Sequence, residues 1–405
     1  MQKRFKPDAG GVFPKWEEVE FGKLFQRRSE KNGDEFGVDK TISVATMHFK
    51  PEGNKAAEES LPKYRVLRKG DIAYEGNKSK HFKHGRFVLN DIGDGIISPI
   101  FEVLQPVSEL SKEVPEFWKY YINYEPVMGK ILAKCANTGI MMNRLAIKDF
   151  YKQKIKVPCI EEQRKIAAAL AAYDEMIAVK TAKLETWQEC KKRMVKEIFG
   201  RAKRFKDDGG REFPEWEEKT LGEVTEYVRN GYSYKPDGLR THKYKVTRIE
   251  TISTGKINPE KLGSCDECDE KYLLKSGDIL YSNINSLSYL GNTAIYKNSS
   301  EKIYHGMNLL CIRPKSGDVD SDYLFAFLNS EAARKFVKYN AQRAVNQCSI
   351  KVSDVRNMKI PLPCMAEQQK IGSFLAEIDK EIEIQKEFIK TYAEGKKRMM
   401  RELME

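Results

Sequence analysis

The sequence lacks the short motifs that indicate a nucleotide-binding or metal-binding site. No G-x-x-x-x-G-K-[ST] phosphate loop and no glycine-rich strand-to-helix fingerprint occurs in its 405 residues. The five histidines have no metal-ligand spacing, and the C-x-x-C pair at Cys265 and Cys268 has no second pair to complete a zinc site. We therefore expect no catalytic residue, no metal site and no cofactor in this chain, and a binding protein rather than an enzyme.

Long hydrophobic runs are also missing. No apolar stretch approaches the roughly 18 residues that a membrane span needs, and no secretory signal is visible near the first residues. The eight cysteines are scattered along the chain, a pattern that suits reduced thiols better than a disulfide framework. We expect a cytoplasmic protein without membrane contact.

Positive charge is plentiful. Lysine and arginine number 71 against 59 acidic residues, which gives a net charge of +12 and a pI of about 9.0. Such a surface attracts polyanions, nucleic acid foremost among them. The alternative, a soluble protein whose basic charge is incidental, stays open at this point.

Much of the sequence occurs twice, about 200 residues apart. The repeated segments are Arg-Phe-Lys at 4–6 and 204–206, Phe-Pro-x-Trp-Glu-Glu at 13–18 and 213–218, and Pro-Cys-x-x-Glu-Gln-x-Lys-Ile at 158–166 and 363–371. A period this long exceeds that of solenoid repeats and indicates two whole domains built alike. Two similar faces suit a partner that has two sites.

Each half ends in a long heptad pattern. Starting at Ile166 and at Ile371, ten successive a and d positions keep the 4-3-4-3 spacing, and eight of the ten are apolar in each run. This pattern predicts two coiled-coil helices of about 57 Å each. The connectivity makes them antiparallel, which would place Lys191 near Ile378 and Lys396 near Tyr173. We expect these two lysines to lie along the seam with their ammonium groups in water.

The regions before the helices carry strand and helix signals in the same order. Gly-Asp-Ile at 70–72 and at 277–279 predicts a turn that feeds an apolar strand, and aromatic segments near 117–122 and 322–328 predict helices. The fold class is therefore α+β, with two similar globular mixed α/β domains separated by two long antiparallel coiled-coil helices. The predicted boundaries are 1–157 and 201–362 for the domains and 158–200 and 363–405 for the helices.

The two domains differ between these landmarks, and the differences carry the candidate nucleic-acid contacts. In the first domain a dense basic loop offers Lys78, Lys80 and Lys83 for phosphates and Asn77 and Arg86 for base edges. The alternative is an ordinary solvated loop between strands.

The equivalent place in the second domain is polar and uncharged, and it offers Asn283, Asn285 and Ser286 for base edges. The alternative there is a plain hairpin turn. Four further candidates add cations and an aromatic side chain to the second domain: Arg229, Tyr232, Lys235 and Arg343.

The ordered pattern resembles the specificity subunit of type I restriction–modification systems. The residues that carry the resemblance are the repeated segments above, the Gly-Asp-Ile turns and the Lys-Lys-Arg-Met ends of the helices at 191–194 and 396–399. They recur in order over essentially the whole chain.

The resemblance implies a non-catalytic DNA-recognition subunit, each half of which reads one part of a bipartite target in double-stranded DNA. It implies that the helices are a spacer and a docking surface for DNA methyltransferase subunits, two of them, which carry S-adenosylmethionine. Restriction and motor subunits would carry ATP and Mg²⁺. Two alternatives remain: a coiled-coil scaffold protein, and an enzyme fused to a reader, against which the missing motifs weigh.

Overall fold

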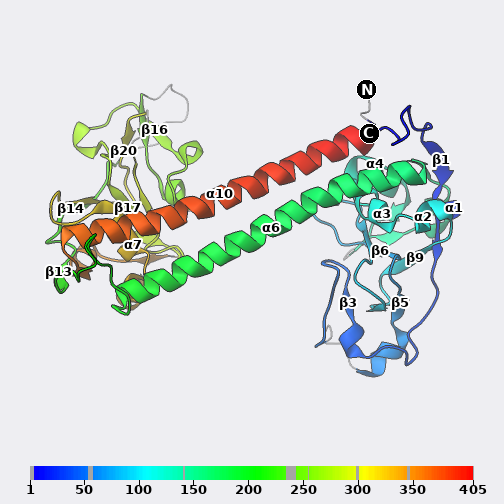
Figure 1. Cartoon of the computed structure of the whole chain (residues 1–405), viewed down its shortest axis with the longest axis horizontal. Coiled ribbons are helices and arrows are strands. Elements are labelled where there is room, and N and C mark those ends of the chain that lie inside the picture. The colour runs from blue at the N-terminus through cyan, green and yellow to red at the C-terminus, as the bar shows by residue number, and fades with distance from the viewer. Residues whose placement is uncertain are drawn as a thin grey trace. The chain divides into compact units, whose positions relative to one another are not determined.

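The computed structural model describes residues 4–52, 58–139, 142–233, 243–253, 255–297, 301–343 and 347–404. The chain divides into two compact units. Unit 1 consists of residues 1–180 and 388–405, and unit 2 consists of residues 181–387. The long helices α6 (Ile160–Phe199) and α10 (Met365–Met404) therefore each contribute to both units (Figure 1).

Each unit is built on a four-stranded antiparallel sheet with the same strand order. The sheet of unit 1 runs β2 (Phe25–Arg27), β9 (Glu102–Pro106), β6 (Ile72–Glu75), β7 (Arg86–Leu89), and that of unit 2 runs β14 (Thr225–Asn230), β21 (Leu310–Pro314), β17 (Ile279–Tyr281), β19 (Thr293–Ile295). The predicted turns precede β6 and β17, where Gly70 and Gly277 have φ of +91° and +90°. Glycine is favoured there because other residues are strained at positive φ.

Smaller pairings complete the units. In unit 1 these are β1 (Glu17–Glu20) with β12 (Lys154–Val157), β3 (Ile42–Ser43) with β4 (His48–Phe49), β5 (Arg65–Leu67) with β8 (Gly95–Ile97), and β10 (Ala136–Asn137) with β11 (Arg144–Leu145). In unit 2 they are β13 (Glu217–Thr220) with β24 (Lys359–Leu362), the sheet β16 (Gly263–Cys265), β15 (Tyr244–Val246), β20 (Ile303–Tyr304), and the sheet β18 (Ile284–Asn285), β23 (Cys348–Ser349), β22 (Gln342–Arg343). The short helices are α1 (Phe21–Leu24), α2 (Glu109–Lys112), α3 (Pro115–Tyr121), α4 (Glu125–Cys135), α5 (Ile147–Tyr151), α7 (Ser321–Leu328), α8 (Glu331–Asn340) and α9 (Val352–Arg356).

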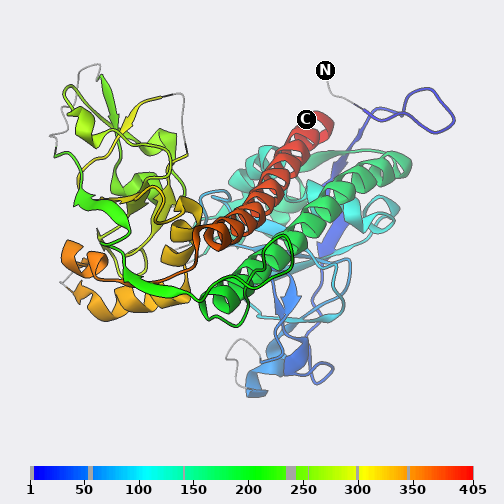
Figure 2. The same ribbon diagram turned by 60° about the vertical axis from the view of Figure 1, so that its left-hand side comes forward.

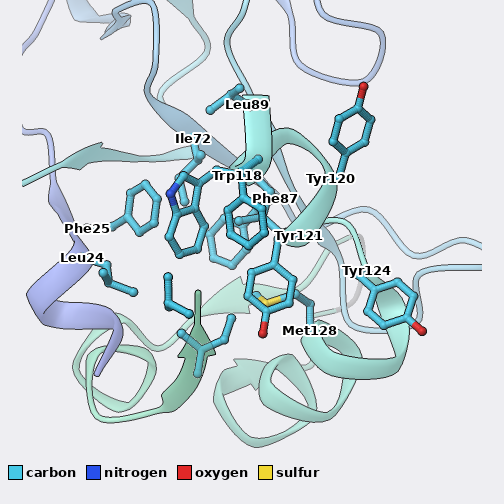
Figure 3. Close-up of a cluster of buried hydrophobic side chains, with 14 of the residues drawn as sticks. Leu24, Phe25, Ile72, Phe87, Leu89, Trp118, Tyr120, Tyr121, Tyr124 and Met128 are labelled. Carbon is cyan, nitrogen blue, oxygen red and sulfur yellow. The ribbon is translucent and has the colours of Figure 1, made fainter. Parts of the chain in front are cut away.

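The core of unit 1 is rich in aromatic side chains. Trp118 of α3 is fully buried and meets Phe25 of β2 edge to face, with ring centroids 5.0 Å apart (Figure 3). Its indole N–H donates to the carbonyl of Leu110 at 2.9 Å, so the ring is buried without an unpaired donor. Burial of side chains of this size contributes about 1.5–3 kcal/mol each, which makes α3 a main support of the sheet.

The long helices lie antiparallel in both units. In unit 1 the Lys180 ammonium lies over the Phe388 ring, and the Tyr173 ring contacts the Tyr392 ring at 6.4 Å. As residue numbers rise along α6 they fall along α10, and both views show the helices side by side (Figures 1 and 2). In unit 2 the last turns of α6, with buried Met194 and Ile198, share a core with the first turns of α10.

Each unit has an ion pair on the helix seam. In unit 2 the Lys191 ammonium lies 2.6 and 2.7 Å from the carboxylate oxygens of Asp379, and in unit 1 the Lys396 ammonium lies 2.6 Å from Asp174. The two lysines lie where the antiparallel register predicted. Their ammonium groups bind carboxylates rather than extending into water alone. The pairs are partly exposed, so each contributes about 0.5–1 kcal/mol.

A buried carboxylate fastens the start of each domain to the start of its long helix. We call each set the carboxylate clamp: Arg4, Trp16 and Glu162 in unit 1, and Arg204, Trp216 and Glu367 in unit 2. In unit 2 the indole N–H of Trp216 donates to Glu367 at 2.8 Å, and the Arg204 guanidinium donates to it at 2.9 Å. In unit 1 the indole N–H of Trp16 donates to Glu162 at 3.0 Å, and the Arg4 guanidinium donates to it at 2.9 and 2.5 Å. The most faithfully repeated segments of the sequence are therefore structural.

The α+β fold class, the two repeated domains and the paired antiparallel helices are confirmed. Between β8 and β9, Ser98–Phe101 forms a turn around Pro99. Helix α6 ends at Phe199, Gly200 follows it, and Arg201 then has a positive φ of +60°. Among the described helices, none combines the length and apolarity that a membrane crossing needs.

Candidate nucleic-acid interface

In unit 1 the basic loop between β6 and β7 lies against the segment that follows α4. We call this region loop surface 1: residues 76–86 together with 136–139 and 142–145. Asn143 joins the two parts, since its backbone N–H donates to the Gly76 carbonyl at 2.8 Å and its side-chain amide donates to the Lys83 carbonyl at 3.1 Å. The Lys78 ammonium adds a contact with the Gly139 carbonyl at 3.2 Å. These three hydrogen bonds fasten the loop to the segment that follows α4.

The cations of loop surface 1 are not equivalent. Lys78, Lys80 and Lys83 are exposed. Arg86 is half-buried, and its guanidinium donates to the Glu75 carboxylate at 2.8 Å and to the Ala45 carbonyl at 2.6 Å. Much of the donor capacity of Arg86 is therefore used inside the unit, whereas the three lysines present their charge to solvent.

Asn77 is exposed at the base of the same loop. Its amide donates to the Glu75 carboxylate at 3.3 Å, a long and weak contact. Its second amide hydrogen and its carbonyl oxygen remain available to a partner. Among the predicted base-reading residues of unit 1, Asn77 is therefore better placed than Arg86.

In unit 2 three of the predicted residues meet around one small sheet, which follows β17. We call this region loop surface 2: residues 282–292 together with 342–343 and 347–349. Asn285 of β18 and Arg343 of β22 both pair with Cys348 of β23, from opposite sides. Asn285 and Arg343 are two strand spacings apart, about 10 Å. They lie on the same face of the sheet, because residues directly opposite each other on neighbouring strands share a face. Ser286 follows Asn285 and is exposed.

Asn283 is buried beneath the exposed part of loop surface 2. It is only 6% exposed, and its backbone carbonyl accepts from the N–H of Ile350 at 2.9 Å. Asn285 is half-buried, and its side chain links the Ser282 hydroxyl at 3.1 Å to the N–H of Ser286 at 2.8 Å. The side chain of Asn285 therefore shapes the turn, and the exposed part of loop surface 2 begins at Ser286.

Arg229 and Tyr232 emerge at the same end of the sheet as loop surface 2, since Asn230 and Tyr281 both pair with Leu310. The Arg229 guanidinium is packed 4.0 Å from the centroid of the Tyr227 ring and donates to the carbonyl of Lys271. The Tyr232 ring is half-buried. Lys235 lies outside the described residues.

The two thiols of the C-x-x-C pair in unit 2 are unreactive. Burial raises the pKa of the Cys265 thiol, and burial raises the pKa of the Cys268 thiol to about 12. Both thiols are therefore protonated at neutral pH, whereas metal ligation and nucleophilic attack need the thiolate. Within the residues that the structure describes, no group of three or more His, Cys, Asp or Glu side chains is arranged to hold a metal ion.

Sequence reasoning missed four residues of these surfaces. Asn143 organises loop surface 1, and Arg334 of α8 donates to Asn292 at 2.9 Å and so supports loop surface 2. Leu287 and Tyr289 stand exposed at the tip of loop surface 2. The available signal was the apolar Leu-Ser-Tyr-Leu run at 287–290 inside a polar loop, which periodicity alone cannot place.

The chain thus contains two α+β domains with a common frame, paired helices and unlike loops. The family model for the type I restriction modification DNA specificity domain matches the chain twice, over residues 15–186 and 214–391. The chain therefore belongs to the family of type I restriction–modification DNA specificity proteins. The match covers both units and both long helices in large part.

Several curated relatives share this assignment. The putative type I restriction enzyme MjaX specificity subunit of Methanocaldococcus jannaschii is 39% identical over 51% of this chain and 49% of its own length. The MjaVIII specificity subunit of the same organism is 28% identical over 76% of this chain and 73% of its own. The EcoKI specificity subunit of Escherichia coli K12 is 25% identical over 58% and 52%. The matched region thus spans about half the length of the first and third relatives.

Solved structures share the fold. The S subunit of the type I restriction–modification system from M. genitalium aligns over 100% of this chain and 99% of its own, with a TM-score of 0.62 and 14% identity. A chain from a structural study of complex assembly and conformational transition in the type I R-M system aligns over 97% and 98%, with a TM-score of 0.55 and 20% identity. At these identities the likeness concerns the fold.

Proposed function

We propose that this chain is the DNA-recognition subunit of a type I restriction–modification complex and that each unit reads one half of a bipartite target in double-stranded DNA. The observation that carries the proposal is the pair of loop surfaces. They occupy the same place in the two repeated frames, after β6 in unit 1 and after β17 in unit 2, and their chemistry differs. A common frame with unlike loops suits two readers of unlike sequences.

The contacts divide between phosphate and base. The exposed Lys78, Lys80 and Lys83 neutralise phosphates, which supplies affinity without sequence information. Asn77, Ser286 and Arg343 are the exposed members of the candidate set with hydrogen-bonding groups for base edges. In this proposal the recognition domains extend over 1–157 and 201–362, the boundaries expected from the sequence.

The helical segments 158–200 and 363–405 serve as spacer and as docking surface for DNA methyltransferase subunits, two in number. Two helices of 40 residues, about 60 Å at 1.5 Å per residue, compare with roughly 17 base pairs of duplex at about 3.4 Å each. This chain carries out no chemistry. S-adenosylmethionine belongs to the methyltransferase subunits, and ATP and Mg²⁺ belong to the restriction subunits.

Methylated-motif mapping tests the proposal directly. The genome of a host that expresses this chain with its methyltransferase partner is sequenced for modified bases, with and without the gene for this chain. We expect a bipartite motif that disappears on deletion. A motif that persists, or methylation without a bipartite motif, would refute the proposal and favour a scaffold role.

A second experiment tests the spacer. About one turn is removed from each helix between the two seam ion pairs, and the motif is mapped again. We expect a changed gap between the half-sites with their bases unaltered. A change of bases with an unchanged gap would contradict the spacer role. Restoration of the original motif by reinserting the same number of alanines serves as the control.

A further inference from the structure

The tip of loop surface 2 exposes two large apolar side chains that folding does not require. Leu287 is 38% exposed and Tyr289 is 49% exposed, on a turn whose other exposed residues are serines. Single exposed hydrophobic residues are common and need no explanation. Here two stand at alternate positions of one turn, and the following Leu290 is buried as the anchor of that turn.

The turn that carries the two side chains is held by several hydrogen bonds. The backbone N–H groups of Tyr289 and Leu290 both donate to the Ser286 carbonyl at 2.9 Å. The base of the loop is closed by Ser282, whose N–H donates to the Asn292 carbonyl and whose carbonyl accepts from Gly291, both at 2.8 Å. From the outside, Arg334 of α8 donates to the Asn292 side chain at 2.9 Å.

The surroundings of the tip are cationic. Arg343 is exposed on β22, two strands from Asn285. Lys338 is exposed one helical turn after Arg334, whose side chain contacts the loop. An apolar tip flanked by positive charge suits a polyanion that also offers apolar area. Duplex DNA does so, because phosphates line its outside, thymine methyl groups lie in its major groove, and base faces become accessible where a base step is partly unstacked.

Loop surface 1 has the opposite character. Its exposed side chains include the three lysines, and among its described residues no large hydrophobic side chain is exposed. Its one phenylalanine, Phe82, is half-buried and lies beneath the Arg86 guanidinium, 5.4 Å from ring centroid to carbon. The same position of the repeated frame therefore presents charge in one unit and apolar surface in the other.

We propose that Leu287 and Tyr289 form an apolar wedge through which loop surface 2 contacts the bases of double-stranded DNA, and that they determine part of the sequence read by unit 2. The inference rests on the proposed DNA-recognition function. Leucine cannot hydrogen-bond, so its contribution is contact with a base face or a thymine methyl group. Tyr289 can stack on a base and keep its hydroxyl in water.

Motif mapping with matched variants tests the wedge. The chain is expressed with its methyltransferase partner as wild type, as the double variant Leu287→Ala/Tyr289→Ala, and as Tyr339→Ala. Tyr339 is 86% exposed on α8 and, five residues on from Arg334, lies on the opposite side of that helix, so it is the control. We expect the double variant to relax one or more positions in a single half-site, or to lose methylation at that motif, while Tyr339→Ala retains the wild-type motif.

The wedge and the DNA-recognition function are refuted by different outcomes. If the wild type gives no bipartite motif, the proposed function is wrong. If the wild type gives one and the double variant reproduces it at the wild-type rate, the wedge is refuted while the function stands. Unfolding of the double variant is monitored by its melting temperature, which should not change, because both side chains are replaced at the surface.

A binding experiment with the assembled complex identifies the kind of contact. The probe is a 40-base-pair duplex that carries the mapped motif, with 2-aminopurine or deoxyuridine placed in the affected half-site. A fluorescence rise with wild type but not with the double variant supports insertion at a base step. An affinity loss on replacing thymine by deoxyuridine supports a methyl contact. Each alanine substitution should weaken binding about 10-fold. Absence of all three effects overturns the proposal.

Discussion

Replacement of Lys78, Lys80 and Lys83 by alanine should reduce the salt dependence of DNA binding by a definite amount. All three ammonium groups are exposed on loop surface 1, so each can neutralise a phosphate. Arg86 is left out of the count because its guanidinium already donates to Glu75 and to the Ala45 carbonyl. The structure therefore predicts three lost phosphate contacts, one for each lysine.

The magnitude follows from counterion release. Each phosphate contact to duplex DNA contributes about 0.9 to the slope of log K against log salt, so three contacts contribute about 2.7. Between about 50 mM and about 200 mM salt, the Kd of the wild type should therefore rise about 40-fold more than the Kd of the triple variant. The bases of the methylated motif should stay the same, because phosphate contacts carry no sequence information.

The assay is fluorescence anisotropy of the assembled methyltransferase complex on a labelled duplex at a series of salt concentrations. A control variant replaces three exposed lysines of unit 1 outside the loop, Lys15, Lys63 and Lys152. It removes the same net charge and should keep the wild-type slope. Equal slopes for all three proteins would refute the assignment of loop surface 1 to phosphate binding. If the slope of the control variant is lower as well, the effect comes from net charge and not from loop surface 1.

Two further predictions concern stability. Glu367→Gln should lower the free energy of unfolding of unit 2 by about 3 kcal/mol, because it breaks the ion pair between the buried Glu367 and Arg204, which keeps some contact with water. Urea unfolding measures this change. A loss below about 0.5 kcal/mol would contradict the carboxylate clamp. His305 is buried, and burial lowers its pKa to about 4, against 6.5 in the unfolded chain. Between these values the unfolded state binds the additional proton, so unfolding free energy should be level above pH 6.5 and fall by about 3 kcal/mol toward pH 4. His305→Gln should remove that fall, and an unchanged pH profile would show that His305 is not its source.

The sequence predicted the frame well because the frame is repeated. The heptad spacing fixed the two long helices and the residues that meet across them, including the positions of Lys191 and Lys396. It did not reveal that Asp174 and Asp379 would receive those ammonium groups, because both aspartates lie off the a and d positions. Nor could the spacing indicate that Glu162 and Glu367 are buried, since a glutamate in the first turn of a helix usually faces water.

The candidate site was less accessible to prediction. The sequence pointed to the right loops, because they interrupt the repeat, but the use of each side chain depends on packing. Asn283 and Asn285 are typical base-reading residues, yet one is buried and the other holds the turn of Ser286. Leu287 and Tyr289 would ordinarily be assigned to a core, and they are exposed because Leu290 fills the available interior position instead.

The division of the long helices between units has a consequence for synthesis of the protein. The core of unit 1 includes Leu403 and Met404 of the last turn of α10, both buried against side chains from the first 170 residues. Unit 2 is continuous from 181 to 387 and can complete its core as soon as that stretch has left the ribosome. The unit that is translated first therefore waits for nearly the whole chain before its core closes. Premature termination a few residues before Leu403 should leave unit 2 folded and damage unit 1, far away in sequence.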